Sequence, residues 1–418
     1  MSHDAILHEI ASKLPVTPNA RKRRIWIACM VVGAASFGFL LATQPQRAWA
    51  SYLVNMLFFL GIAMGGVTFA AAIRLCNGHW AGPIQRLGES LSSYLPAGIA
   101  TVALFLVFGA PSVFPWVQHP DPRQAPYLNL PFLAARSLGG LLLFGWLARR
   151  MVAVSLRPDA RALLPHVAPE LKPAYEKLTE GWRGDAAEEA WQRHQLAHLA
   201  PQVALAYAVF VTVMGWDFVM SLTPNWISGL FGWFVWAGAF LSAIAMVVFL
   251  ATQVRTKYRL EPYVTSAHFW DTGKVMFSFS IFWVYLFWSQ YLPIWYANMP
   301  EETWWVFIRF EEPWRALSFT VFGMVFLIPY LGLMNKTTKS SPFWMMCFSL
   351  VILAGVWLER HVLVMPSVHP ERVWLGLPEA GVMLGFLGVF GWRVQGFLTK
   401  YPCVNVYDLL HPRGGHGH

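Results

Sequence analysis

Charged residues are scarce in this chain of 418 residues. Asp, Glu, Lys and Arg make up 13% of it, whereas hydrophobic residues make up 56% and aromatic residues 16%. A soluble globular domain has about 25% charged residues, and the mean hydropathy of this chain is +0.45. The composition therefore excludes a water-soluble protein and predicts an all-α polytopic membrane protein.

Cysteine is also rare, and Cys29, Cys76, Cys347 and Cys403 stand far apart. They form none of the C-x-x-C, C-x-x-C-H or ferredoxin-type spacings that bind iron–sulfur clusters or attach haem c. The 13 histidines include no H-E-x-x-H zinc motif. We therefore expect neither a metal site nor a covalently bound redox centre in this chain.

No cleavable signal peptide is recognisable, because a polar segment and the basic run Arg21 to Arg24 precede the first apolar run. This arrangement predicts an uncleaved start-transfer segment. The net charge of +9 would favour nucleic-acid binding in a soluble domain. Here the basic residues flank apolar runs, where membrane topology accounts for them, so a nucleic-acid partner is excluded.

Ten apolar runs are long enough to cross a bilayer. All but seven of the 31 Lys and Arg residues fall on the side that holds both termini and the even-numbered connections. Both termini are therefore predicted to be cytoplasmic. The predicted helices are Ile25 to Leu41, Tyr52 to Ile73, Leu95 to Ala110, Phe132 to Val154, Leu199 to Leu222, Ile227 to Thr252, Val275 to Tyr296, Trp314 to Met334, Phe343 to Leu358 and Leu377 to Leu398.

These helices suggest how the chain is organised. A cytoplasmic segment, 1–24, precedes helices one to six in 25–254, and helices seven to ten in 255–398 precede a cytoplasmic tail, 399–418. The composition of the cytoplasmic loop at 155–198 allows two short helices. The eight inner helices could form two four-helix groups, which we place on either side of the loop from Arg255 to Lys274.

The seventh helix carries a stripe of polar residues. At 100° per residue, its members fall within about 40° of one meridian. Hydrocarbon cannot satisfy such groups, so the stripe is expected to face protein or water, either as a proton path or as hydrogen bonds between helices. The members are Asp271, Lys274, Ser278, Tyr285, Ser289 and Tyr296, and Gln290 lies beside them before a predicted bend at Pro293.

Asp217 is predicted to be the only carboxylate well inside an apolar run. No cation lies within a turn of it, which favours a proton-exchanging group over an ion pair. His194 and His198, at the cytoplasmic end of the same helix, could form an inner proton entrance with His268, Asp271 and Lys274. The alternative is that these groups are ordinary solvated helix ends.

The outer end of the seventh helix has the groups that a quinone needs. A quinone head requires hydrogen-bonding side chains, and its tail requires an apolar slot. Tyr291, Trp295, Tyr296 and Glu301 could supply them. The aromatic residues are equally typical of the interfacial belt of a membrane protein.

Three stretches resemble a known family. They are FWSQYLPIWYANMPEET (Phe287 to Thr303), WDFVMSLTPNWISGLFG (Trp216 to Gly232) and RHVLVMPSVHP (Arg360 to Pro370). Together they resemble the NrfD-like, polysulfide-reductase-type membrane subunits of bacterial alternative complex III. The resemblance implies ten helices with two four-helix bundles, a place in the bacterial inner membrane, and a role in quinol oxidation coupled to proton movement.

The resemblance also implies partners and ligands. These are a second NrfD-like membrane subunit, periplasmic iron–sulfur and cytochrome c subunits that hold the iron–sulfur clusters and haem c, lipids, a terminal oxidase, and a quinol such as menaquinone. The segment from Gly61 to Val67 has Met64 where the longer membrane subunit has a quinol-pocket histidine. The chain therefore resembles the shorter subunit. A purely architectural anchor and an independent secondary transporter are the alternatives.

Overall fold

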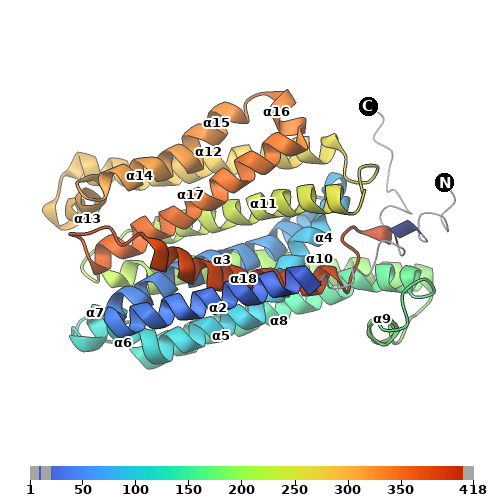
Figure 1. Cartoon of the computed structure of the whole chain (residues 1–418), viewed down its shortest axis with the longest axis horizontal. Coiled ribbons are helices and arrows are strands. Elements are labelled where there is room, and N and C mark those ends of the chain that lie inside the picture. Colours follow the sequence, from blue (N-terminus) through green and yellow to red (C-terminus); the bar gives the residue numbers. More distant parts are fainter. Residues whose placement is uncertain (1–8, 11–19, 408–418) are drawn as a thin grey trace.

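The computed structural model describes residues 9–10 and 20–407, and this part of the chain consists of helices and connections without strands. Ten helical segments within it are long and apolar enough to cross a membrane, which confirms the ten-helix prediction. They lie side by side along the long axis of the molecule (Figure 1). The segments are Ala20–Thr43, Pro45–Leu75, Gly82–Val113, Leu130–Leu163, Asp185–Leu222, Phe231–Lys257, Ser266–Ala297, Arg315–Gly332, Pro342–Val368 and Leu377–Leu398.

Seven of these segments are single helices that carry labels in Figure 1: α2 (Ala20–Thr43), α3 (Pro45–Leu75), α8 (Leu130–Leu163), α11 (Phe231–Lys257), α12 (Ser266–Ala297), α17 (Pro342–Val368) and α18 (Leu377–Leu398). α10 (Asp185–Phe218) is followed by a short 3₁₀ turn. The third segment contains α4 (Gly82–Leu91), α5 (Leu95–Leu104) and α6 (Ala110–Val113). The eighth contains α14 (Arg315–Phe322) and α15 (Ile328–Gly332). Shorter helices lie in the connections: α7 (Pro115–Gln118), α9 (Lys172–Thr179), α13 (Pro300–Phe310) and α16 (Lys336–Ser340).

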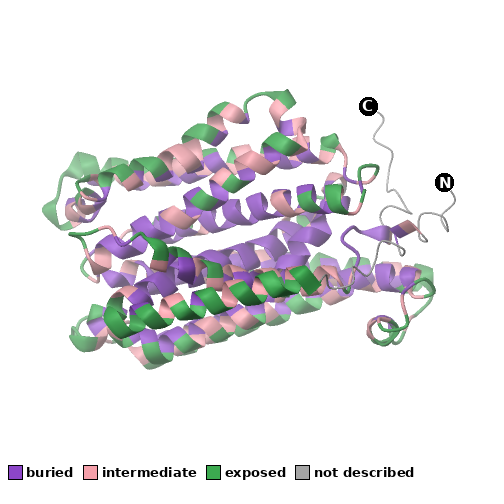
Figure 2. Ribbon diagram, in the orientation of Figure 1, coloured by how far each residue is buried: buried purple, intermediate pink, exposed green. Residues whose placement is uncertain are grey.

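The centre of the molecule is formed by α3 and α11, which are buried along nearly their whole length (Figure 2). α3, α5, α8 and α10 form one group of helices, and α12, α14, α15 and α17 lie on the other side of α11. α11 packs against α3 and α10 as well as α12 and α17, so it belongs to both groups. Helices that contact protein on every side are apolar all round, as these two are.

α2 and α18 pack against each other on the flank of this core. A side chain at Gly385 would place its Cβ 2.8 Å from the Cα of Gly33, so only glycine allows the two backbones to approach this closely. The start of α2 and the end of α18 lie at the same end of the molecule (Figure 1), as an even number of crossings requires. Which side of the membrane this end faces stays a prediction.

A π-helical turn interrupts both the third and the eighth segment, at Phe105–Gly109 and Gly323–Leu327. Such turns leave backbone carbonyls without their usual intrahelical partner. The hydroxyl of Ser280 on α12 donates a hydrogen bond to the freed carbonyl of Val325. The second π-turn therefore joins α12 to the eighth segment.

Two expectations about helix ends are corrected. The ninth helix was expected to end at Leu358, but α17 continues through Glu359, Arg360 and His361 to Val368. Three polar residues in a row suggest a loop, but here neighbouring helices surround them and the backbone stays helical. In the loop at 155–198, only α9 forms a separate short helix, because the remaining helical residues extend α8 and α10.

Candidate ligand cavity and buried charges

A cavity of about 500 Å³ lies between α12, α13, α14 and α17. Ligand sites of small organic molecules span about 300–1,000 Å³ and are mostly apolar with a few polar groups. The polar side chains at this cavity are Gln290, Arg309, Ser318 and Glu359. Its aromatic and aliphatic lining includes Trp226, Phe234, Trp283, Phe287, Tyr291, Trp305, Phe310, Phe319, Val362 and Leu363.

Glu359 brings a carboxylate to the cavity wall, and only 2% of its surface is exposed. Its Oε1 accepts a hydrogen bond from the indole N–H of Trp283 at 3.1 Å. Its Oε2 has no hydrogen-bond partner among the described residues, although Nη1 of Arg360 lies 3.7 Å away. Buried carboxylate oxygens normally have a donor, so this oxygen, which faces Gly238 of α11, is an acceptor whose hydrogen bond is not made within the described structure.

Arg360 and His361 extend this polar group toward the centre of the molecule. Nη2 of Arg360 donates to the carbonyl of Val235 on α11 at 2.9 Å. The Nδ1 atom of His361 lies 3.3 Å from the carbonyl of Trp357, while its Nε2 atom is buried without a partner in the described structure. Three consecutive buried polar residues in a membrane helix are costly, and such groups usually mark a functional site.

Gly238 of α11 makes room for the ion pair on α17. A Cβ atom at this position would lie 2.9 Å from Oε2 of Glu359 and 3.1 Å from Nη2 of Arg360. Both distances are shorter than ordinary van der Waals contacts. The absence of a side chain at Gly238 therefore allows α11 to pack directly against the two charged groups.

Arg309 of α13 places a positive charge at the opposite wall. It donates to the carbonyls of Val362 at 3.0 Å and Leu363 at 2.9 Å, and to the hydroxyl of Ser367 at 2.7 Å. Its guanidinium lies 3.4 Å from the centroid of the Trp305 ring. Burial lowers the pKa of Arg309. These contacts fix α13 to the end of α17.

The predicted quinone residues meet the cavity only in part. Tyr291 lines it, as does Gln290, whose Oε1 accepts from the hydroxyl of Ser228 at 3.2 Å. Trp295 and Tyr296, with 60% and 84% of their surfaces exposed, lie outside it, and so does the exposed Glu301. The cavity is therefore lined by the part of α12 from Trp283 to Ile294, and three members of the predicted cluster lie outside it.

The polar stripe of α12 faces away from the rest of the chain. Lys274, Ser278, Tyr285 and Tyr296 are exposed, and Tyr285 only reaches the rim of the cavity with 59% of its surface exposed. Asp271 and Ser289 are half-buried, and Asp271 forms a 2.6 Å ion pair with Lys274. The stripe therefore does not line an interior path of this chain, and a role in proton transfer stays a prediction.

The two parts of the predicted inner proton entrance are not brought together. His194 and His198 are exposed on α10, with their Nε2 atoms 3.3 Å apart. His268 helps to cap the start of α12, where its Nδ1 accepts from the backbone N–H of Thr265 at 3.0 Å. α10 packs against α3, α8 and α11, whereas α12 lies beyond α11.

Asp217 forms an ion pair, contrary to the expectation that it has no nearby cation. Arg136 of α8 donates to both of its carboxylate oxygens, each at 2.8 Å. The phenol of Tyr127 donates to Oδ1 at 2.9 Å. Burial and the neighbouring carboxylate raise the pKa of Tyr127 to about 12, so the phenol keeps its proton at neutral pH. Asp217 was also not the only carboxylate inside an apolar segment, because Glu359 is another.

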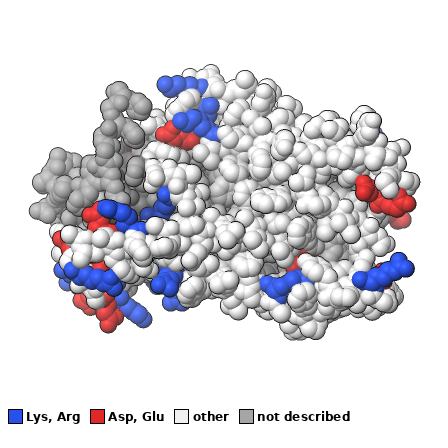
Figure 3. Space-filling view, turned by 180° about the vertical axis from the view of Figure 1, so that it is seen from behind, with Lys and Arg blue, Asp and Glu red and all other residues white. Residues whose placement is uncertain are grey.

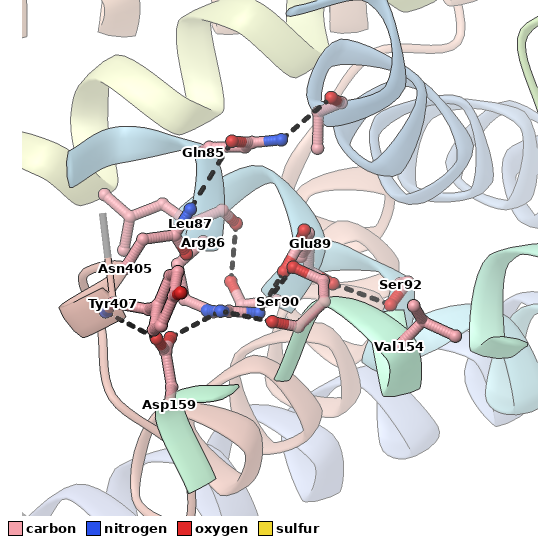
Figure 4. A network of polar contacts seen from close by, with 12 residues as sticks. Gln85, Arg86, Leu87, Glu89, Ser90, Ser92, Val154, Asp159, Asn405 and Tyr407 are labelled. Atoms are coloured by element: carbon pink, nitrogen blue, oxygen red, sulfur yellow. Dashed lines mark hydrogen bonds and ion pairs between the residues drawn. The ribbon is translucent and has the colours of Figure 1, made fainter. Parts of the chain in front are cut away.

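A second polar network joins residues of α4 and α8 (Figure 4), and α4 lies toward the end of the molecule where α2 begins (Figure 1). Arg86 of α4 is hydrogen-bonded to Glu89 and, through Nη2, to Asp159 of α8 at 2.6 Å. The backbone N–H of Tyr407 donates to the other oxygen of Asp159 at 2.8 Å. This network joins α4, α8 and the segment that follows α18.

Sequence reasoning missed Glu359 and Arg309 as cavity residues. The ninth helix was predicted to end at Leu358, directly before Glu359, Arg360 and His361, although the apolar residues Val362 to Met365 after them signal that the helix continues. No protein-family model matches the chain, and no curated protein matches it.

Proposed function

We propose that the chain is an NrfD-like membrane subunit of a quinol-oxidising complex of the alternative complex III type, in the bacterial inner membrane. The observation that supports this most is the position of the three stretches that carry the resemblance. Gln290 and Tyr291 of the first, Trp226 of the second, and Val362 and Leu363 of the third all line the same cavity. Stretches so far apart in sequence have a common spatial role.

The chemistry of the cavity fits a quinol. Oxidation of a quinol yields a quinone, two electrons and two protons. The aromatic walls suit the ring and the first part of an isoprenoid tail, and the carboxylate of Glu359, whose Oε2 has no hydrogen-bond donor, would accept one of the two protons of the quinol. The electrons pass to the iron–sulfur clusters and haem groups of partner proteins on the outer face.

Quinone binding can be measured directly, because four tryptophans, Trp226, Trp283, Trp288 and Trp305, line the cavity. Purified protein is titrated with a short-chain menaquinone, and quenching of tryptophan fluorescence is recorded. We expect saturable quenching, and an affinity about tenfold lower for Glu359→Gln, since a hydrogen bond to a charged group contributes about 1.5 kcal/mol or more.

Glu301→Gln is the matched control, because it makes the same change at an exposed residue outside the cavity. Its affinity should equal that of the wild type. Quenching that does not saturate, or equal losses in both variants, would remove the quinol from this cavity. Purification from native membranes tests the complex: iron–sulfur and haem proteins should accompany the chain.

The outward stripe of α12 favours a second function, a membrane anchor for neighbouring subunits. Polar side chains that face out of a chain within the membrane are satisfied when another protein covers them. Under this hypothesis, Ser278→Leu with Tyr285→Leu should release neighbouring proteins from the purified complex. Quinone binding should be lost as well if the stripe serves the cavity, and unchanged if the stripe serves assembly alone.

A further inference from the structure

Three lysines surround one indole ring where α12 and α16 meet. The ammonium nitrogens of Lys339, Lys274 and Lys336 lie 4.6, 5.4 and 5.6 Å from the centroid of Trp270. Cation–π attraction acts over such distances. Asp271 is the carboxylate at this place, and it pairs with Lys274 at 2.6 Å. The lysines of this group, called the Trp270 cluster below, therefore outnumber the acidic group.

Lys339 is the unusual member of the Trp270 cluster because only 7% of its surface is exposed. Its ammonium forms no hydrogen bond or ion pair within the described part of the chain, and its nearest charge-stabilising groups are the rings of Trp270 and Phe277. Burial, with the charge of Lys274 adding to it, lowers the pKa of Lys339. An ammonium on a largely buried stem without a neighbouring anion leaves its charge uncompensated, so this position is suited to receive an anion.

The stem of Lys339 is held in place. A Cβ atom at Gly273 of α12 would lie 3.0 Å from Cγ of Lys339, so the glycine provides the surface on which the stem packs. Asn335 caps α16 by accepting from the backbone N–H of Thr337 at 3.0 Å. The hydroxyl of Thr338 donates to the carbonyl of Gly332 at 2.6 Å. The position of the ammonium is therefore fixed before any ligand binds.

The position of the Trp270 cluster is that of a membrane interface. α16 lies at the end of α12 and α17 where α2 starts and α18 ends (Figure 1). Basic side chains gather over this part of the molecule, at the top of Figure 3. On either side of α16 in the sequence, Leu331, Met334 and Phe343 expose about 60% of their surfaces, at 62%, 59% and 60%. A charged site thus lies next to apolar surface.

We propose that the Trp270 cluster binds the phosphate headgroup of an anionic phospholipid. Lysines between membrane helices at the interface recognise such headgroups. The phosphate would accept hydrogen bonds from Lys339 and from the exposed Lys336, while acyl chains cover Leu331 and Phe343. The adjacent apolar side chains favour a lipid over a free phosphate ion. This site is independent of the quinol cavity.

The test measures lipid binding to the purified full-length protein by native mass spectrometry. Phosphatidylglycerol, phosphatidylcholine and inorganic phosphate are added separately. We expect phosphatidylglycerol to bind, and its affinity to fall about fivefold for Lys339→Met and for Lys336→Met, since each interfacial lysine contributes about this much. Lys177→Met, on the exposed surface of α9, removes the same charge and should leave the affinity unchanged.

Three other outcomes would each contradict the proposal. If phosphatidylcholine binds as tightly as phosphatidylglycerol, the site does not recognise the headgroup charge. If Lys177→Met loses as much affinity as Lys339→Met, the effect is one of net charge alone. Inorganic phosphate that displaces phosphatidylglycerol at a similar concentration would overturn the lipid as the ligand. Should Lys339→Met fail to fold, the exposed Lys336→Met still decides between these results.

Discussion

The free energy of unfolding should fall far more when Arg136 or Asp217 is replaced alone than when both are replaced together. Asp217 is 1% exposed, so Arg136→Met leaves a buried carboxylate without a counterion, a change that costs about 3–5 kcal/mol. Asp217→Asn leaves the guanidinium, whose side chain is 14% exposed and partly hydrated, so about 1.5–3 kcal/mol is expected. Replacing both, as Asp217→Leu with Arg136→Met, removes the charges together and should be nearly neutral.

The measurement is the free energy of unfolding in mixed detergent micelles, followed by circular dichroism across a denaturing-detergent titration. The double-mutant cycle then gives the coupling energy of the pair. Tyr127→Phe, which loses one hydrogen bond to the carboxylate, should cost about 1.5 kcal/mol. An Arg136→Met variant within about 0.5 kcal/mol of the wild type would refute the ion pair, because ordinary surface changes lie in that range.

The same variants separate a structural from a proton-conducting role of Asp217. A carboxylate that carries protons cannot be replaced by leucine, whereas a carboxylate that only neutralises Arg136 can be when the arginine is replaced too. In reconstituted vesicles, coupled turnover in the double variant would restrict Asp217 to the ion pair. Loss of coupling in a variant that folds as well as the wild type would support the proton path.

Two glycines give further tests of helix packing. Gly238→Ala should lower the free energy of unfolding by about 1–3 kcal/mol, because the new Cβ would lie 2.9 Å from Oε2 of Glu359. It should also weaken quinone binding. The control is Gly139→Ala, whose new Cβ would lie in open space and should stabilise the protein slightly. Gly385→Ala should weaken the contact of α2 with α18, because its Cβ would lie 2.8 Å from the Cα of Gly33. The yield of cysteine cross-linking between these two helices should therefore fall. Gly396→Ala, in the same helix and with no atom within 4 Å of its new Cβ, is the control.

The ten helices could be predicted because a membrane span needs only length and low charge. The bounds of α18 agree with the predicted Leu377 to Leu398. The prediction ended the ninth helix too early, at Leu358 directly before Glu359, because hydropathy treats an ion pair inside the protein as if it were exposed to lipid. A charged triplet followed by further apolar residues does not distinguish a loop from a buried cluster until the neighbouring helices are known.

The position of the polar stripe could not be derived from the sequence either. Periodicity places Ser278, Tyr285 and Tyr296 on one side of α12, but it does not say which side faces the core. In the structure the inward side holds Trp283 and Ser280, which contact Glu359 and the π-turn. The partner of Asp217 was missed for a similar reason, since Arg136 lies on another helix far earlier in the chain.

The hydrogen bonds of the buried carboxylates indicate where a proton could be exchanged. Both oxygens of Asp217 accept from Arg136, and both oxygens of Glu379 accept from Arg47. A carboxylate held in this way can take up a proton only by giving up an ion pair. Oε2 of Glu359 has no such bond, and Glu359 is one of the residues that line the cavity, so protonation of this carboxylate breaks no bidentate pair. Glu359, and not Asp217, is therefore the first position at which to test proton transfer from a bound quinol.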